Sequence, residues 1–397
     1  MTDTKMNLDH RHARKLREKS IEVLNELQNK NGGCFASPPG ARYPYVYPRD
    51  LAIVILGFIE AGLMDRAKSA LSFVFRSQRS DGAFPQRLDA EGGDASYKPV
   101  QLDSVGLILI AFACYARATR DGRAISRWWS KAERGVKYLR AQHDPAGSGL
   151  LISMNSIHEF PPIERGFEAW ANACAWAALT ELAALGDHLG RRRPSWVHAA
   201  EQIKVGVEKR MWNPRFKTFV KVIRLREENS VHIGPDASVY ALADFGMFSD
   251  DDPRIVSTVK LIEKKLWHPT LGGLCRYPEW VGRNNGGWGP WPHFTLMLCR
   301  HFIRRGDKAR AVKYLDWVLS VADRNLLPEH ISTVKDFSAY VTDYTSAGLL
   351  RQDRSVLVRN ALKHPAYKKG IAYVTLPLGW PHAEFIITYA LFRKRFG

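Results

Sequence analysis

Residues 45–63, YVYPRDLAIVILGFIEAGL, decide the fold, because they join a polar, aromatic segment to a long apolar run. The run from Leu51 to Leu63 is nearly free of charge, which is typical of a helix buried on all of its faces. The turn at 62–65, GLMD, then supplies a stop signal and a start signal, and apolar residues return at helical spacing over 65–78. The stretch therefore predicts a helical hairpin.

The same pattern continues along almost the whole chain, whereas the alternation typical of strands is scarce. Similar short turns recur at 121–122, 251–253 and 306–307. Helices are expected over residues 9–29, 49–62, 65–78, 101–119, 125–142, 167–189, 194–211, 235–246, 253–266, 290–304, 307–323 and 379–394. Six hairpins suit an all-α (α/α)6 barrel with inner helices surrounded by outer ones. We expect a single domain over residues 1–397.

Long loops alternate with the short turns. They fall at 30–48, 80–100, 143–166, 212–234, 267–289 and 324–378. In such a barrel these loops would gather at one end and line a pocket, where function usually resides. The segment from 330 to 375 is too long for a plain connection and is expected to carry small strands or a lid.

Composition excludes several classes of function. The formal net charge is +18, but the basic residues are spread along the chain without a nucleic-acid motif, so no nucleic-acid partner is expected. Apolar runs stay below the roughly 20 residues of a membrane span, and the five cysteines lack metal-binding spacing. We therefore expect no membrane, no metal and no cofactor. The N-terminal residues have no apolar export signal, which predicts a cytoplasmic address, and the oligomeric state is left open.

The loops concentrate groups that suit a sugar. Aromatic rings cover the C–H faces of a sugar, and charged groups hold its hydroxyls, so Tyr47, Arg49 and Asp50 together suit a polyhydroxylated ligand. The same segment also fits a packed helix start in which Arg49 pairs with Asp50. Further residues of these kinds in the loops are Gln101, Asp103, Glu164, Arg165, Arg276, Glu279, Trp288, Trp291, Glu329 and Trp380.

Taken in order, the motifs YVYPRD, QLD, IERG, GPDAS, RYPE with NGGWGPW, LPE and PLGWPHAE resemble glycoside hydrolase family 15, the glucoamylase type. The resemblance implies exo-acting hydrolysis of α-glucosides with inversion, which releases β-glucose from the non-reducing end. It also implies that Glu164 is the general acid and Glu329 the general base. In such a pair the acid protonates the leaving oxygen and the base activates water, across about 6.5–9.5 Å.

The resemblance places the remaining residues around the terminal glucose. Arg49 and Asp50 would grip hydroxyls, Arg276 would hold hydroxyls near the reacting carbon, and Glu279 would orient that arginine. Those that would complete the pocket are Tyr47, Gln101, Asp103 and Arg165, with Trp288, Trp291 and Trp380 as its walls. Gln101 and Asp103 equally suit a helix start with ordinary capping, and each tryptophan equally suits a packed core ring.

Two departures from the family pattern qualify these assignments. Ile163 stands where the family commonly has tryptophan before the acid, so Glu159 and Glu168 compete with Glu164. Neither an N-terminal β-sandwich nor a starch-binding module is recognisable, which favours a small malto- or isomalto-oligosaccharide as the substrate. A trehalase of the same family and a non-catalytic glycan-binding or regulatory barrel remain as alternatives.

Overall fold

A computed structural model describes residues 8–154, 165–225, 231–232, 236–276, 288–346, 348, 350 and 353–397. These residues form fourteen α-helices and seven short strands. The chain divides into two compact units. The central unit comprises Gln28–Phe35 and Tyr45–Thr258, and the terminal unit comprises Met1–Leu27, Ala36–Pro44 and Val259–Gly397.

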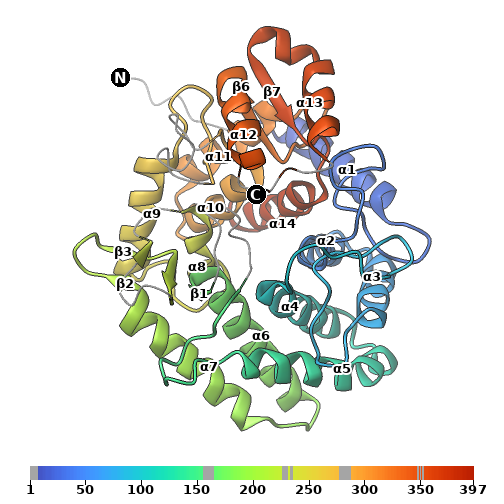
Figure 1. The fold of residues 1–397 in the computed structure, drawn as a ribbon, viewed down its shortest axis with the longest axis vertical. Coiled ribbons are helices and arrows are strands. Elements are labelled where there is room, and N and C mark those ends of the chain that lie inside the picture. Colours follow the sequence, from blue (N-terminus) through green and yellow to red (C-terminus); the bar gives the residue numbers. More distant parts are fainter. Residues whose placement is uncertain are drawn as a thin grey trace. The chain divides into compact units, whose positions relative to one another are not determined.

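The central unit is built from hairpins of one buried and one amphipathic helix. Its helices are α2 (Pro48–Glu60), α3 (Met64–Arg76), α4 (Leu102–Thr119), α5 (Gly122–Ala141), α6 (Ala169–His188), α7 (Pro194–Gly206) and the short α8 (Ala241–Asp244). Helix α4 packs between α2 and α6, and α3, α5 and α7 cover them (Figure 1). In α5 the buried residues recur at helical spacing, as in Trp128, Ala132 and Val136, so only one face is apolar. The hairpin predicted from residues 45–63 is confirmed.

Helix α4 shows how closely the buried helices approach. A Cβ atom added at Gly106 would lie 2.8 Å from the backbone of Cys174 in α6, so glycine is what permits this contact. Helix α4 has the length and hydropathy of a membrane span, yet 78% of it is buried inside the protein. Such burial is typical of the core helix of a soluble protein.

Short strands connect these hairpins. Strand β1 (Gly166–Glu168) pairs antiparallel with β4 (Val222–Arg224), which pairs antiparallel with β5 (Val231–His232). A second ladder joins β2 (Trp212–Asn213) to β3 (Thr218–Phe219). Because α6 begins directly after β1, the first ladder fixes the start of a buried helix.

The terminal unit contains α1 (His10–Leu27), most of α9 (Pro253–Leu266), α10 (Pro292–Arg304), α11 (Lys308–Val321) and α14 (Gly379–Phe396). Helix α14 packs against both α1 and α10, and α11 packs against α10 (Figure 1). Buried charge joins α10 to α14, since Arg300 of α10 donates to Glu384 of α14. Short turns pair α2 with α3, α4 with α5 and α10 with α11, so α1 finds its partner in α14 at the far end of the chain.

The long segment after residue 329 carries structure of its own. Strand β6 (His330–Thr333) pairs antiparallel with β7 (Ile371–Val374), and α12 (Val334–Ser346) and α13 (Arg354–Lys363) lie between them in the chain. We call residues 330–374 the β6–β7 insert. The expected small strands are confirmed, and the two helices are an addition.

All twelve predicted helices are present, with ends that differ by a few residues. The largest difference is at 235–246, where a 3-10 helix (Ala237–Tyr240) precedes a short α8. The Asp236 side chain accepts a hydrogen bond from the amide of Ser238 and so starts the tighter 3-10 turn.

Candidate active site

The terminal unit holds the carboxylate of Glu329 in a dense set of donors just before β6. Its Oε1 accepts a hydrogen bond from the Tyr43 hydroxyl at 3.1 Å, and its Oε2 accepts from Thr375 at 2.9 Å and from Arg42 at 3.3 Å. The residue is 7% exposed. Its amide donates to the carbonyls of Val374 and Thr375 at 3.0 Å each, so the strand pair β6–β7 fixes the backbone as well.

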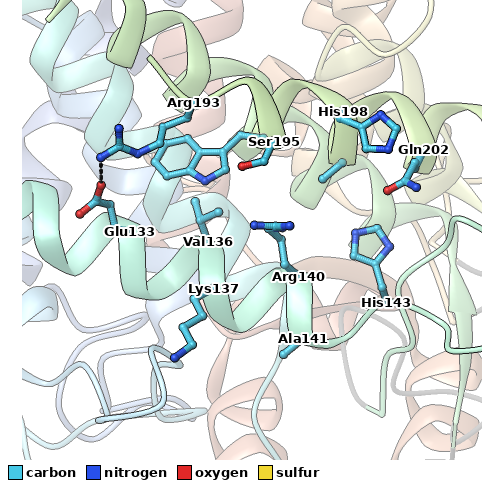
Figure 2. Close-up of a pocket in the computed structure, with 12 residues that line it drawn as sticks. Glu133, Val136, Lys137, Arg140, Ala141, His143, Arg193, Ser195, His198 and Gln202 are labelled. Carbon is cyan, nitrogen blue, oxygen red and sulfur yellow. Dashed lines mark hydrogen bonds and ion pairs between the residues drawn. The ribbon is translucent and has the colours of Figure 1, made fainter. Parts of the chain in front are cut away.

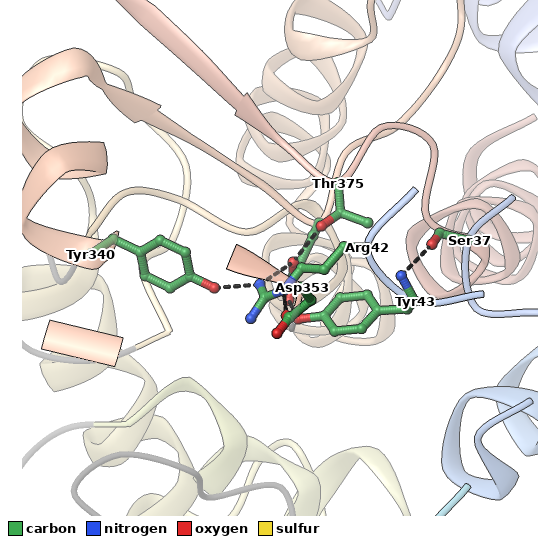
Figure 3. A network of polar contacts seen from close by, with 7 residues as sticks. Ser37, Arg42, Tyr43, Tyr340, Asp353 and Thr375 are labelled. Carbon is green, nitrogen blue, oxygen red and sulfur yellow. Dashed lines mark hydrogen bonds and ion pairs between the residues drawn. The ribbon is translucent and has the colours of Figure 1, made fainter. Parts of the chain in front are cut away.

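Arg42 extends this network beyond Glu329. Its Nε donates to Asp353 at 2.8 Å and its Nη1 donates to the Tyr340 hydroxyl at 2.5 Å, as Figure 3 shows. The guanidinium also lies 4.5 Å from the centre of the Tyr43 ring. Burial acts to lower the pKa of Arg42, but Tyr340, Tyr43, Glu329 and Asp353 together raise it well above its usual value. The side chain is therefore a permanent buried cation.

Neither Arg42 nor Tyr43 was predicted from the sequence. Both precede the YVYPRD motif in the stretch GARYPYVYPRD, and they meet Glu329 across a separation of more than 280 residues. The available signal was the tyrosine and arginine just ahead of the motif, in the same loop as the predicted sugar-binding residues.

In the central unit, Arg49 is held by Asp103. Its Nε and Nη2 donate to the two carboxylate oxygens of Asp103 at 2.7 and 3.3 Å, and the Trp170 indole donates to the same carboxylate at 2.9 Å. Asp103 is fully buried, and Arg49 is 7% exposed. Neighbouring positions on a helix do not face each other, so Arg49 and Asp50 diverge at the start of α2. The fork of Arg49 onto Asp103 joins α2 to α4 and was not predicted from the sequence.

Two further predicted residues lie near the starts of the same helices. Gln101 immediately precedes α4 and is 2% exposed. Tyr47 immediately precedes α2, and burial raises the pKa of its hydroxyl well above the usual value. The fork therefore lies among residues that the sequence had assigned to the sugar site.

The predicted aromatic walls lie in the terminal unit and are packed. Trp288 is fully buried and donates its indole N–H to Asp343 at 3.0 Å. Trp291 stacks on His330 at 4.4 Å, with the Arg276 guanidinium 5.2 Å from its ring centre. Trp380 stacks on His293 at 4.8 Å and donates to Glu384. A sugar-contacting role for these rings stays a prediction.

The histidine beside Glu329 is neutral. Burial, followed by the charge of Arg42, lowers the pKa of His330 well below its usual value. The His330 ring lies between Trp291 on one side and the edge-on ring of Tyr340, 4.9 Å away, on the other. These contacts favour a packing role for His330 next to Glu329.

Of the residues considered for the general acid, only Glu168 lies in the part of the chain that the structure describes. Glu164, Glu159 and Glu279 lie outside the described residues. Arg165 is exposed, and Glu168 is fully buried at the end of β1, where its carbonyl accepts from Asn172. The assignment of Glu164 as the acid therefore stays a prediction. Within the described ranges, no three His, Cys, Asp or Glu side chains are arranged to hold a metal.

A groove of about 660 Å³ lies between α5 and α7. Figure 2 shows Arg140 of α5 pointing into it, with Ser195 and His198 on the α7 side. Glu133 and Arg193 form an ion pair across the groove, with 2.5 Å between Oε1 and Nη2. Its lining includes none of the residues predicted for the sugar site.

Residues 17–351 match the sequence profile of Glycosyl hydrolases family 15. The chain belongs to this family. The matched range contains Arg42, Arg49, Asp103 and Glu329, whereas Asp353 and Thr375, which contact Arg42 and Glu329, follow its end.

This family 15 chain is similar in sequence to two curated proteins from archaea. It is 26% identical over 376 residues to an uncharacterised glycosyl hydrolase of Methanocaldococcus jannaschii, which covers 93% of this chain and 54% of the relative. It is 26% identical over 247 residues to Trehalase 1 of Sulfolobus acidocaldarius, which covers 60% of this chain and 38% of the relative. The chain thus spans about half, or less, of the curated relatives it matches.

Among solved structures, a bacterial glucoamylase in complex with acarbose superposes with a TM-score of 0.69. The two are 18% identical over 96% of this chain and 58% of that chain. This likeness shows the fold: the family 15 chain is an all-α protein of the six-hairpin, (α/α)6 type, as the sequence predicts.

Proposed function

We propose that this chain is an inverting, exo-acting α-glucoside hydrolase that releases β-glucose from the non-reducing ends of short malto- or isomalto-oligosaccharides. Membership of family 15 supports glycoside hydrolysis. A sugar-type ligand is supported by the glucoamylase neighbour, which was solved with acarbose.

The observation that carries the proposal is the environment of Glu329. Three donors, one of them a buried cation, point at its carboxylate. Donors of this kind favour an ionised, accepting carboxylate, which is the state a general base needs in order to take a proton from water. Glu329 is therefore proposed as the base, and Glu164 as the acid that protonates the leaving oxygen.

The fork of Arg49 and Asp103 supports the binding half of the proposal. A bidentate pair fixes the guanidinium plane, and the Trp170 indole holds the carboxylate from a third direction. A rigid, buried arginine beside Asp50 suits the hydroxyls of a terminal sugar. A pocket that ends in such a pair would admit only chain ends, which supports an exo mode.

Trehalose is the second candidate substrate. One observation favours it, which is the similarity to Trehalase 1 of Sulfolobus acidocaldarius. Hydrolysis of trehalose would use the same pair of carboxyl groups and would differ in the site for the leaving glucose. Glucose release from maltose, isomaltose, kojibiose, nigerose and trehalose, compared at equal concentrations, separates the candidates.

The proposed role of Glu329 is tested by Glu329→Gln, with Glu133→Gln as the matched control on an outer helix. Loss of a general base lowers the rate by roughly 10²- to 10⁴-fold, so kcat should fall by that amount in Glu329→Gln alone. Full activity in Glu329→Gln would remove Glu329 from the mechanism. Sugar binding by calorimetry without turnover of any α-glucoside would favour a non-catalytic, glycan-binding barrel.

A further inference from the structure

Arg42 stands between two carboxylates that come from different segments. Its Nη1 reaches Glu329 at 3.3 Å, and its Nε reaches Asp353 at 2.8 Å. Figure 3 shows Arg42 together with Asp353. The side chains of Arg42 and Glu329 are 4% and 9% exposed, whereas that of Asp353 is 27% exposed. The buried Arg42 is thus shared by Glu329, the proposed base, and by Asp353, a partly exposed acid of the β6–β7 insert.

The shared cation has a consequence for the basicity of Glu329. A cation within hydrogen-bonding distance favours an ionised carboxylate and so weakens it as a base. A second carboxylate on the same guanidinium offsets part of that effect. Asp353 therefore has the geometry to keep Glu329 ionised but still basic enough to accept a proton.

The charges of Arg42 and Asp353 influence the basicity of Glu329, because two other titratable groups nearby are neutral. The described titratable groups near the Glu329 carboxylate include Arg42, Tyr43, Tyr340, Asp353 and the adjacent His330. Burial raises the pKa of Tyr340 well above its usual value and lowers the pKa of His330 well below it, so both stay neutral near pH 7. Arg42 and Asp353 are thus two charged groups linked directly to Glu329 through one guanidinium.

We propose that Arg42 is a positioning residue that couples Glu329 to Asp353, so that the β6–β7 insert sets the basicity of the base. The proposal rests on the proposed function, in which Glu329 is that base. Arginine suits the task better than lysine, since its planar fork presents separate N–H donors to the two carboxylates. Tyr340 of α12 holds the same guanidinium from the insert, which adds a contact without adding charge.

The test is the acidic limb of the pH profile of kcat/KM, which reports protonation of the essential base in the free enzyme. Arg42→Gln removes the cation, so the limb should move upward by about one pH unit or more. Asp353→Asn removes the opposing charge, so the limb should move downward, by a smaller amount. Tyr340→Phe is the matched control, because it removes a partner of Arg42 without changing charge, and its limb should stay in place.

A lysine variant separates charge from geometry. Arg42→Lys keeps the cation but loses the fork, so its limb should stay near that of the wild type while kcat falls. The effect of Asp353→Asn should also shrink in the Arg42→Gln background, because the two residues act on one site. A structural role alone would not move the limb in opposite directions.

The outcomes are distinguishable from those of the proposed function. If Glu329→Gln retains full rate, the proposed function fails. If Glu329→Gln is inactive but the limb moves in the same direction in Arg42→Gln and Asp353→Asn, or does not move, only the coupling is overturned. Should Arg42→Gln fail to fold, Asp353→Asn still decides through the direction of its shift, because its side chain is partly exposed.

Discussion

We predict that the buried His382 makes the fold less stable in mild acid. The residue is fully buried at the start of α14, where its Nε2 accepts a hydrogen bond from the Leu327 amide at 3.0 Å. Its Nδ1 lies 2.8 Å from the Ser20 hydroxyl, so the ring proton is assigned to Nδ1. Burial, with a smaller effect from the charge of Lys19, lowers the pKa of His382 from 6.5 to about 3.

The size of the effect follows from linkage. A histidine whose pKa is lowered in the folded state stabilises the fold fully above its unfolded pKa of 6.5, and this stability is lost as the pH falls toward the folded value. With a folded pKa of about 3, the loss is roughly 2 kcal/mol by pH 5 and about 4–5 kcal/mol by pH 3.

Urea unfolding between pH 8 and pH 5 measures this directly for wild type and His382→Asn. At pH 8 the variant should be less stable by about 1–3 kcal/mol, because the Leu327 amide loses its acceptor. By pH 5 this difference in the free energy of unfolding should shrink by about 2 kcal/mol. Only the wild type has a buried histidine that is protonated more readily in the unfolded state, so only the wild type loses stability as the pH falls. The exposed His198→Asn is the matched control. A gap that stays constant across this range would refute the reasoning.

The remaining predictions concern packing, charge and the sugar site. Gly106→Ala should lower the free energy of unfolding by about 1–3 kcal/mol, because its Cβ would press on the α6 backbone, whereas Gly122→Ala, with nothing within 4 Å, should stay within about 0.5 kcal/mol in the same urea experiment. Glu384→Gln should lower stability by about 1.5–3 kcal/mol in thermal unfolding, because the buried Arg300 loses a charged hydrogen-bond partner, and an unchanged unfolding temperature would contradict this. Asp50→Ala should lower kcat/KM on maltose by about 100-fold with an unchanged circular dichroism spectrum, since charged hydrogen bonds to substrate are lost; near-normal activity would return Asp50 to a helix-start role.

Much of the helical fold was predictable from local pattern. The hairpin at residues 45–63 follows from an uncharged run, a glycine turn and an amphipathic run, each of which is encoded within about twenty residues. The pairing of α1 with α14 was not encoded in this way, because no short turn joins them and their contact brings together opposite ends of the chain.

The sequence pointed to candidate residues for the site but not to the contacts that they make. The sequence identified Arg49, Asp103 and Glu329 from the motifs that contain them. It could not show that Arg49 forks onto Asp103, 54 positions away, or that Arg42 and Tyr43 reach Glu329. Contacts of such long range are set by the packing of hairpins, which leaves no local signature in the sequence.

Proton NMR of the first-formed sugar tests the central claim most directly. In the proposed mechanism, Glu329 activates a water molecule that attacks opposite the leaving group, and this geometry inverts the anomeric centre. Hydrolysis of maltose or isomaltose, followed before mutarotation, should therefore show β-glucose first. If α-glucose appears first, hydrolysis proceeds with retention and the account is contradicted.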